Sequence, residues 1–191
     1  EASMYSPEWM DVIGDYLNWK GFKSGCCYFM AHMNENFDDK RKAVIARYSP
    51  ISQEDFNAGA FDINWFKDTY EELGKEHFNV IYNCAKYISD GAKHARAQKY
   101  ADAVLGLISP QKAEADITSK RNKDMVMAYS LIPINGEDEL CHRYLFLQQF
   151  LKESKKFGSQ RKTSEARAVE IAIHNLAYNA GYSDIMRFTL F

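Results

Sequence analysis

The apolar side chains of this chain recur at intervals of about 3.6 residues, the period of an α-helix. Four stripes show the pattern most clearly, and they run through residues 9–17, 78–88, 140–151 and 169–180. No segment alternates cleanly between apolar and polar residues, as a half-buried strand would. Residues 125–132 are the best strand candidate, but they fit a buried helix that ends before Pro133 equally well. The spacing therefore predicts an all-α fold.

Helix-capping residues divide the chain at short intervals. Ser-Pro pairs and cap residues with following acids mark helix starts, and glycines at the ends of periodic stretches indicate left-handed C-caps. The expected starts are at Ser6, Ser52, Ser109 and Asn135, and the expected glycine stops are Gly21, Gly74, Gly158 and Gly181. This punctuation predicts about ten helices, with helix pairs recurring at roughly 40 residues as in HEAT-like solenoids. Because no repeat is visible as sequence self-similarity, an irregular helical bundle remains the alternative to a HEAT-like helical repeat.

The length of 191 residues suits a single all-α domain over residues 1–191, and the Asn135–Gly136 turn is the best internal boundary. The chain begins at Glu1 without an initiator Met and ends in the apolar residues 187–191. Ordinary termini are polar, so we expect a segment of a longer polypeptide.

Charge and cysteine usage restrict the class of protein further. The formal charge of −2 gives no overall attraction to nucleic acid or to an anionic membrane. The four cysteines form no CxxC pair, which favours a reducing, cytoplasmic compartment. No apolar run approaches the roughly 20 residues of a membrane span, so no membrane partner is predicted.

Two pairs of side chains have the spacing of metal ligands on one helix face: Glu139 with His142, and Glu170 with His174. Di-iron bundles need two Glu-x-x-His copies and two further glutamates, and this chain has one copy. Glu139 suits the first turn of a helix for dipole reasons, and Glu170 and His174 form a solvated ladder with Arg167. The sequence therefore predicts no metal, no cofactor and no catalytic residue.

A basic segment is the best candidate for a binding surface, with a charge of +4 over residues 152–167. Its cationic residues are Lys152, Lys155, Lys156, Arg161, Lys162 and Arg167. Two smaller clusters lie at residues 93–99 and 120–123. If helix packing aligned the three clusters, they would form a stripe able to contact phosphates. The alternative is a set of solvated helix faces balanced by acids.

The C-terminal segment, residues 152–189, resembles part of large uncharacterised bacterial proteins described as molybdate-metabolism-regulator-like, some of which carry a WGR module. The matching residues are Lys155-Lys156-Phe157-Gly158-Ser159-Gln160-Arg161, Ser164-Glu165-Ala166, Ala168-Val169-Glu170-Ile171-Ala172, Asn175-Leu176-Ala177 and Asn179-Ala180-Gly181-Tyr182. The resemblance implies a helical internal piece of a much longer protein and transfers no catalytic residue.

Three functions remain open. The first is a non-catalytic helical scaffold that contacts the rest of its polypeptide or a protein partner, and it predicts an exposed apolar patch. The second is a nucleic-acid-binding part of a regulator, acting through the basic stripe. The third is an all-α enzyme whose site assembles from distant residues, with the two carboxylate–histidine pairs as the only group worth testing.

Overall fold

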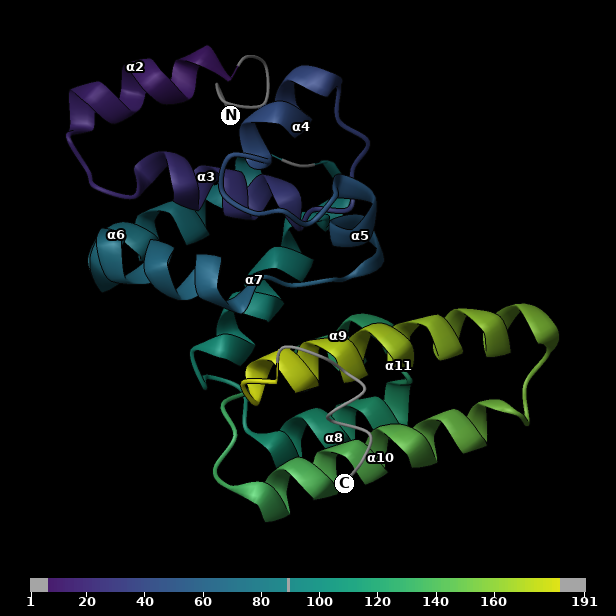
Figure 1. The fold of residues 1–191 in the computed structure, drawn as a ribbon. Helices are drawn as coiled ribbons and strands as arrows, with labels where there is room; N and C mark the ends of the chain where they lie inside the picture. Colours follow the sequence, from purple (N-terminus) through teal and green to yellow (C-terminus); the bar gives the residue numbers. More distant parts are fainter. Residues whose placement is uncertain (1–6, 89, 183–191) are drawn as a thin grey trace. The chain divides into compact units, whose positions relative to one another are not determined.

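The computed structural model of the chain describes residues 7–88 and 90–182, and its secondary structure there is entirely helical. The α-helices are α2 (Glu8–Leu17), α3 (Phe22–Ala31), α4 (Asp39–Ile45), α5 (Gln53–Ala58), α6 (Ile63–Cys84), α7 (His94–Val104), α8 (Pro110–Lys120), α9 (Lys123–Tyr129), α10 (Glu137–Ser154) and α11 (Ser159–Asn179) (Figure 1). Two short 3-10 helices, η1 (Ala85–Tyr87) and η2 (Asp90–Ala92), separate α6 from α7. The predicted all-α class is confirmed, and the strand candidate at residues 125–132 falls largely within α9.

Two predicted helix starts are confirmed by their hydrogen bonds. Ser109 caps α8 by accepting from the Lys112 amide at 3.3 Å. Ser52 precedes α5, and its hydroxyl accepts from the Asp55 amide at 3.1 Å. The predicted start at Ser6 lies outside the described residues.

The glycines divide into confirmed and wrong predictions. Gly181 follows α11 with a φ of 86°. Gly74 breaks α6 as expected, but it is no left-handed C-cap, because its φ of 69° and ψ of 162° form a different conformation that glycine alone adopts easily. Gly21 is not a stop either, because it begins α3 as the N-cap. Gly158 is not a left-handed stop, because its φ is −61° and it begins α11 as the N-cap. The cap of α10 is Gly136, not Asn135.

The chain forms two compact units. Unit 1 comprises residues 1–57 and 62–98, and unit 2 comprises residues 58–61 and 99–191. The boundary therefore does not fall at the Asn135–Gly136 turn. Since two compact units can still fold in one cooperative step, the single-domain expectation remains a prediction.

Unit 1 is built around α3, which packs against α2, α4 and α6 (Figure 1). Seven of the ten residues of α3 are buried, so this helix needs neighbours on nearly every side. A buried hydrogen-bond chain joins it to α6: the Trp65 indole donates to Ser24 Oγ at 2.8 Å, and Ser24 Oγ lies 2.6 Å from Thr69 Oγ1. Gly25 permits close approach of the two helices, because a Cβ there would lie 2.8 Å from Leu73 Cδ1.

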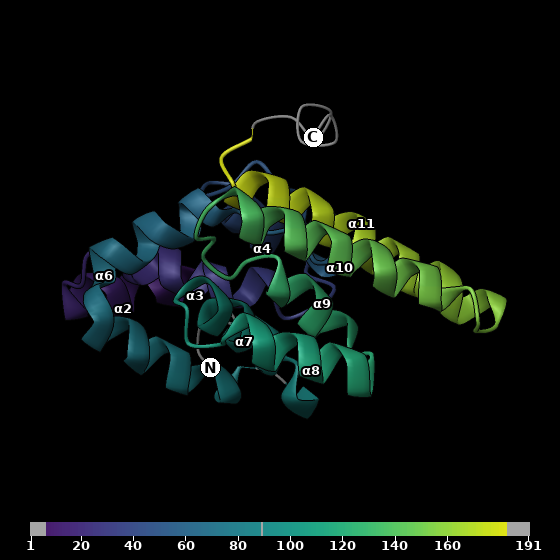
Figure 2. The same cartoon turned by 90° about the horizontal axis from the view of Figure 1, so that it is seen from below.

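Unit 2 is built around α11, which packs against α9 and forms a helical hairpin with α10 (Figure 2). Asn175 on α11 fastens the short segment 58–61: its amide donates to the Gly59 carbonyl oxygen at 3.1 Å and accepts from the Phe61 amide at 3.2 Å. Arg143 of α10 is fully buried and donates to the carbonyl oxygens of Ile132 and Pro133. It therefore holds the α9–α10 connection against α10.

Candidate interaction surfaces

The predicted basic segment surrounds the turn between α10 and α11, at one end of the hairpin (Figure 2). All six predicted cationic residues are exposed. Arg161 pairs with Glu165, and Arg167 pairs with Glu170, at 2.9 Å in both cases. The remaining four, which are Lys152, Lys155, Lys156 and Lys162, form no ion pair with any described residue. Their charge is therefore available to a partner.

The same end of unit 2 contains a largely buried ionic cluster that the sequence does not reveal. Arg121, the C-cap of α8, donates to both carboxylate oxygens of Glu165 on α11, at 3.1 and 2.6 Å. It also donates to Glu153 at 3.2 Å, and to the Phe150 carbonyl oxygen and Ser154 Oγ of α10 at 3.1 Å each. One guanidinium thus joins the ends of three helices.

The carboxylate of Glu165 is the centre of this cluster and remains ionised. Its side chain is 2% exposed, and burial alone would raise its pKa. Hydrogen bonds from Arg121, Ser154 and Arg161, together with the charge of Arg121, outweigh burial and lower the pKa to about 2. The ionised carboxylate of Glu165 therefore binds Arg121 and helps hold α8, α10 and α11 together.

The structure joins two of the three basic clusters. Arg121 and Lys123 contact α11 directly, since Lys123 Nζ donates to Ser164 Oγ at 2.5 Å. Residues 116–124 and 152–170 together carry nine basic and five acidic side chains, a net charge of +4. We call these two segments the basic tip. The cluster at residues 93–99 belongs mostly to unit 1, where Lys93 pairs with Glu35.

A polar pocket of about 350 Å³ opens in the basic tip. Six residues from α8, α9 and α11 and their connections line it, namely Arg121, Lys123, Gln160, Arg161, Ser164 and Glu165. Phe157 supports two of them, because the guanidinium carbons of Arg161 and Arg121 lie 4.1 and 5.0 Å from its ring centre. Phe157 is 36% exposed, so it packs beneath cations at the surface instead of entering the core.

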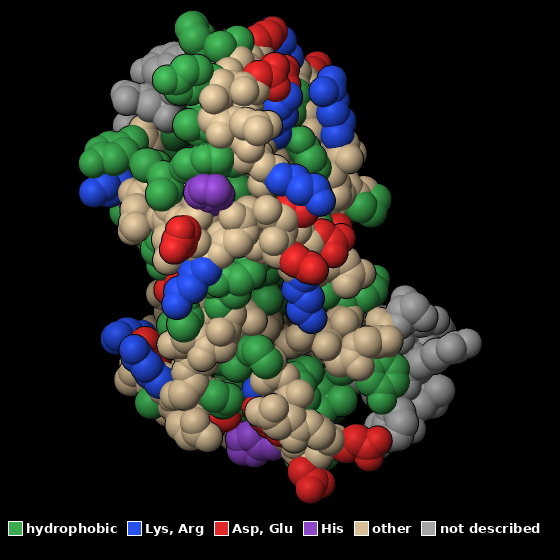
Figure 3. Space-filling model, turned by 90° about the vertical axis from the view of Figure 1, so that its left-hand side faces the viewer, with side chains coloured by type: hydrophobic (Ala, Val, Ile, Leu, Met, Phe, Trp, Pro, Cys, Tyr) green, Lys and Arg blue, Asp and Glu red, His purple; other side chains and the backbone are tan. Residues whose placement is uncertain are grey.

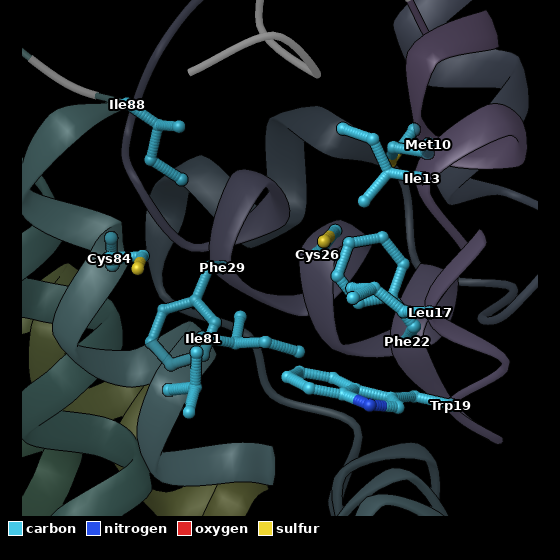
Figure 4. Close-up of a pocket in the computed structure, with 12 residues that line it drawn as sticks. Met10, Ile13, Leu17, Trp19, Phe22, Cys26, Phe29, Ile81, Cys84 and Ile88 are labelled. Carbon is cyan, nitrogen blue, oxygen red and sulfur yellow. The ribbon is translucent and has the colours of Figure 1, made fainter.

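Unit 1 carries a different kind of concavity, an open groove of about 340 Å³. Its lining residues come from α2, α3, the second half of α6 and their connections, and none carries a charged side chain; they are Met10, Ile13, Leu17, Trp19, Phe22, Cys26, Phe29, Val80, Ile81, Cys84, Ala85 and Ile88. Figure 4 shows the α2 side chains on one side and Phe29, Ile81 and Cys84 on the other, with Cys26 between them. We call this concavity the apolar groove.

Hydrophobic side chains continue past the apolar groove onto the surface of unit 1. Val80 on its α6 side is 48% exposed, and the outer face of α2 exposes Trp9 (51%), Val12 (58%) and Tyr16 (88%). Green side chains reach the surface between charged ones on the side of α2 and α6 that faces the viewer in Figure 3. Contiguous apolar patches on monomeric soluble proteins often mark interaction sites, whereas singly exposed hydrophobic residues are common. The exposed face of α2 is recognisable in the sequence, because this helix carries apolar residues at helical spacing on two of its sides and can bury only one of them.

The two carboxylate–histidine pairs are not brought together among the described residues. Glu139 pairs with Arg143, and His142 Nε2 lies 3.0 Å from Glu114 on α8. Glu170 is held by Arg167, and no hydrogen bond or ion pair links it to either member of the first pair. Within residues 7–88 and 90–182, no group of three His, Cys, Asp or Glu side chains is placed to hold a metal ion.

A comparison with known protein families covers nearly the whole chain. A protein-family model described as "Family of unknown function (DUF5724)" matches residues 1–190, and its description does not mention molybdate metabolism or a WGR module. No curated protein and no solved structure matches the chain significantly. Among the described residues, no helix is long and apolar enough to cross a membrane.

Proposed function

The chain belongs to a family of unknown function (DUF5724), and we propose that it is a non-catalytic helical interaction segment whose apolar groove binds an amphipathic helix. The helix would come from a protein partner or from another part of the same polypeptide. The observation that carries the proposal is the open, uncharged lining of the apolar groove. An exposed apolar surface of this kind is what the scaffold hypothesis predicts from the sequence.

The chemistry of the apolar groove selects an apolar occupant. Transfer of a charged or unpaired polar group into a lining without charges is costly, so the seated part of the ligand must be hydrophobic. The ten residues of α2 form a wall about 15 Å long at 1.5 Å per residue. Two to three turns of a helix have this length and present anchors at positions i, i+3 or i+4, and i+7, as in known helix-in-groove complexes.

The charged residues beside the apolar groove are already paired. Helix α2 has three acids, Glu8, Asp11 and Asp15, and no basic residue. Glu8 pairs with Lys40, and Asp11 and Asp15 lie 2.7 and 3.7 Å from Lys23 Nζ. We therefore expect the apolar anchors of the partner helix, and not its charge, to decide binding.

The test is selection of helical peptides from a displayed library on the wild-type protein. Val80→Glu places a charge in the wall of the apolar groove, whereas Leu145→Glu makes a similar change at an exposed position on unit 2. We expect the enriched peptides to share the apolar spacing of a helix. They should bind the Leu145→Glu variant as they bind the wild type, and they should not bind the Val80→Glu variant. A fluorophore on Cys84 should respond to them. Peptides that bind both variants equally, or no enrichment at all, would refute the proposal.

A second candidate function is nucleic-acid binding through the basic tip, and the joining of two basic clusters in unit 2 favours it. Each phosphate neutralised adds about 0.9 to the slope of log affinity against log salt on duplex DNA. Joint neutralisation of Lys155, Lys156, Arg161 and Lys162 should reduce both the affinity and this slope. An affinity for DNA that the quadruple substitution leaves unchanged would exclude the basic tip as the nucleic-acid-binding surface.

The proposal also includes three expectations from the sequence. They are a HEAT-like arrangement of the helices, a bacterial regulator-like parent protein and a cytoplasmic location. All four cysteines are free thiols in the structure, which supports a reducing compartment. The helical hairpin of α10 and α11 supports stacking of helix pairs.

A further inference from the structure

The polar pocket of the basic tip has the composition of an anion site, and it shares no lining residue with the apolar groove. Three of its six lining residues are cations, namely Arg121, Lys123 and Arg161, and one is an anion, Glu165. With Glu165 ionised, the three cationic side chains leave the lining with a net charge of +2. A phosphomonoester carries between about −1.5 and −2 at neutral pH, so it would neutralise the pocket.

The pocket also offers hydrogen-bond donors that no described residue uses. Arg161 donates to Glu165 through Nε, and its two terminal nitrogens make no hydrogen bond to a described residue. Lys123 uses one of its three donors on Ser164, whose own hydroxyl proton remains available. The Gln160 side-chain amide likewise has no partner among the described residues. These donors could bind the three oxygens of a phosphoryl group.

The same donors are held in place before any ligand arrives. Arg121 lines the pocket, and its five hydrogen bonds to α10 and α11 hold the end of α8 against α11, which supplies most of the other lining residues. Arg161 is fixed at Nε by Glu165 and rests on the Phe157 ring, 4.1 Å from its centre. A preorganised guanidinium loses less freedom on binding and suits the bidentate geometry of phosphate.

We propose that the pocket lined by Arg121, Lys123, Gln160, Arg161, Ser164 and Glu165 binds the phosphoryl group of a phosphomonoester, such as a phosphorylated serine or threonine on a partner. A phosphodiester of nucleic acid carries a single charge and one fewer terminal oxygen, so it leaves part of the charge and some donors unmatched. The proposal does not depend on the apolar groove.

The test is a titration of the 191-residue chain by amide NMR with four probes at constant ionic strength. The probes are inorganic phosphate, a phosphoserine peptide, its unphosphorylated counterpart, and a DNA duplex without terminal phosphates. We expect phosphate and the phosphopeptide to shift the amides around residues 121–123 and 160–165, and the unphosphorylated peptide to leave them unchanged. Binding by the phosphopeptide but not by inorganic phosphate would still support the site, because peptide contacts add affinity.

Variants locate the site. Lys123→Gln and Arg161→Gln each remove a charged donor, and each should weaken phosphopeptide binding roughly ten- to a hundredfold. Lys112→Gln, an exposed lysine at the other end of α8, should leave the affinity unchanged. Because Arg161 also contacts Glu165, a thermal denaturation curve must accompany that variant, and Lys123→Gln keeps the test valid if Arg161→Gln unfolds.

Two results would overturn the proposal. One is the absence of any phosphate- or phosphopeptide-dependent shift in the pocket amides of the folded protein. The other is equal binding of the DNA duplex and the phosphopeptide with equal losses in both variants, which would show a general phosphate-contacting surface. Neither result affects binding of a helix in the apolar groove, so the failure of the two proposals can be told apart.

Discussion

Glu165→Gln should destabilise the protein by about 3 kcal/mol at neutral pH while preserving the shape of the side chain. The folded pKa of about 2, against an ordinary value of 4.5, corresponds to a difference of about 2.5 pKa units. At about 1.36 kcal/mol per unit, this gives roughly 3 kcal/mol. Loss of the carboxylate also leaves the Arg121 guanidinium, whose side chain is 10% exposed, without its main partner, and breaking a buried pair typically costs about 3–5 kcal/mol.

The pH dependence gives the same prediction an independent check. Because the folded pKa lies below the unfolded one, the stabilisation is complete above about pH 4.5 and falls as the pH drops toward 2. About 2 kcal/mol of it should be lost between pH 7 and pH 3. The difference in unfolding free energy between wild type and Glu165→Gln should shrink by that amount over the same range.

Urea denaturation is the assay, since guanidinium would screen the ion pairs. Glu170→Gln is the matched control: Glu170 pairs with Arg167 at 2.9 Å, but both side chains are 55% exposed, so the change should cost less than about 1 kcal/mol. All three tryptophans, Trp9, Trp19 and Trp65, belong to unit 1. Far-UV circular dichroism therefore reports both units, and tryptophan fluorescence reports unit 1 alone.

A Glu165→Gln variant as stable as wild type, with an unchanged pH profile, would refute the electrostatic reasoning. The two signals also test the single-domain prediction. If the variant shifts both transitions together, residues 1–191 unfold as one cooperative domain. If only the circular dichroism signal shifts, the two units unfold separately.

Two further predictions concern buried groups. Arg143→Lys should lower the free energy of unfolding in urea by about 2–4 kcal/mol, because a lysine ammonium cannot donate to the Ile132 and Pro133 carbonyl oxygens and to Glu139 at the same time. A change below about 0.5 kcal/mol would show that the α9–α10 connection does not depend on the planar guanidinium group. A thiol reagent should modify exposed Cys84 and Cys141 quickly in the native protein, half-buried Cys26 more slowly, and buried Cys27 only on unfolding, because burial raises the pKa of Cys26 to about 12 and also raises that of Cys27. Four equally fast thiols would contradict the packing of α3.

Local chemistry made much of the fold predictable from the sequence. Hydrophobic spacing identifies helices because their buried faces repeat at a fixed period, and Ser52 and Ser109 mark starts because their hydroxyls bind the first-turn amides. Gly158 was misplaced because a glycine beside a helix fits either end of it. The start of α10 was placed one residue early, at Asn135 instead of Gly136, because asparagine is the more common N-cap residue. The sequence shows that a break occurs, but the backbone angles that decide which end are set by packing.

The candidate surfaces were predictable in part. The exposure of the six basic residues at 152–167 is predictable from charge alone, because solvated cations need no tertiary partner, whereas their role in binding stays a prediction. Arg121 and Glu165 are 44 residues apart, so no local pattern connects them. The apolar groove was anticipated only as an exposed patch, since its lining comes from helices separated by some 70 residues. Long-range pairing decides such features, and a single sequence does not encode it visibly.

The C-cap of α8 has a consequence for protein engineering. Arg121 adopts a left-handed conformation, with φ 49° and ψ 42°, where replacement by glycine usually relieves backbone strain and raises the melting temperature. Here glycine would remove the guanidinium that joins three helix ends, and the loss would exceed the relief several times over. Stabilisation by consensus helix-capping rules should therefore fail at this position, and a screen of designed variants should reject the substitution that those rules rank first.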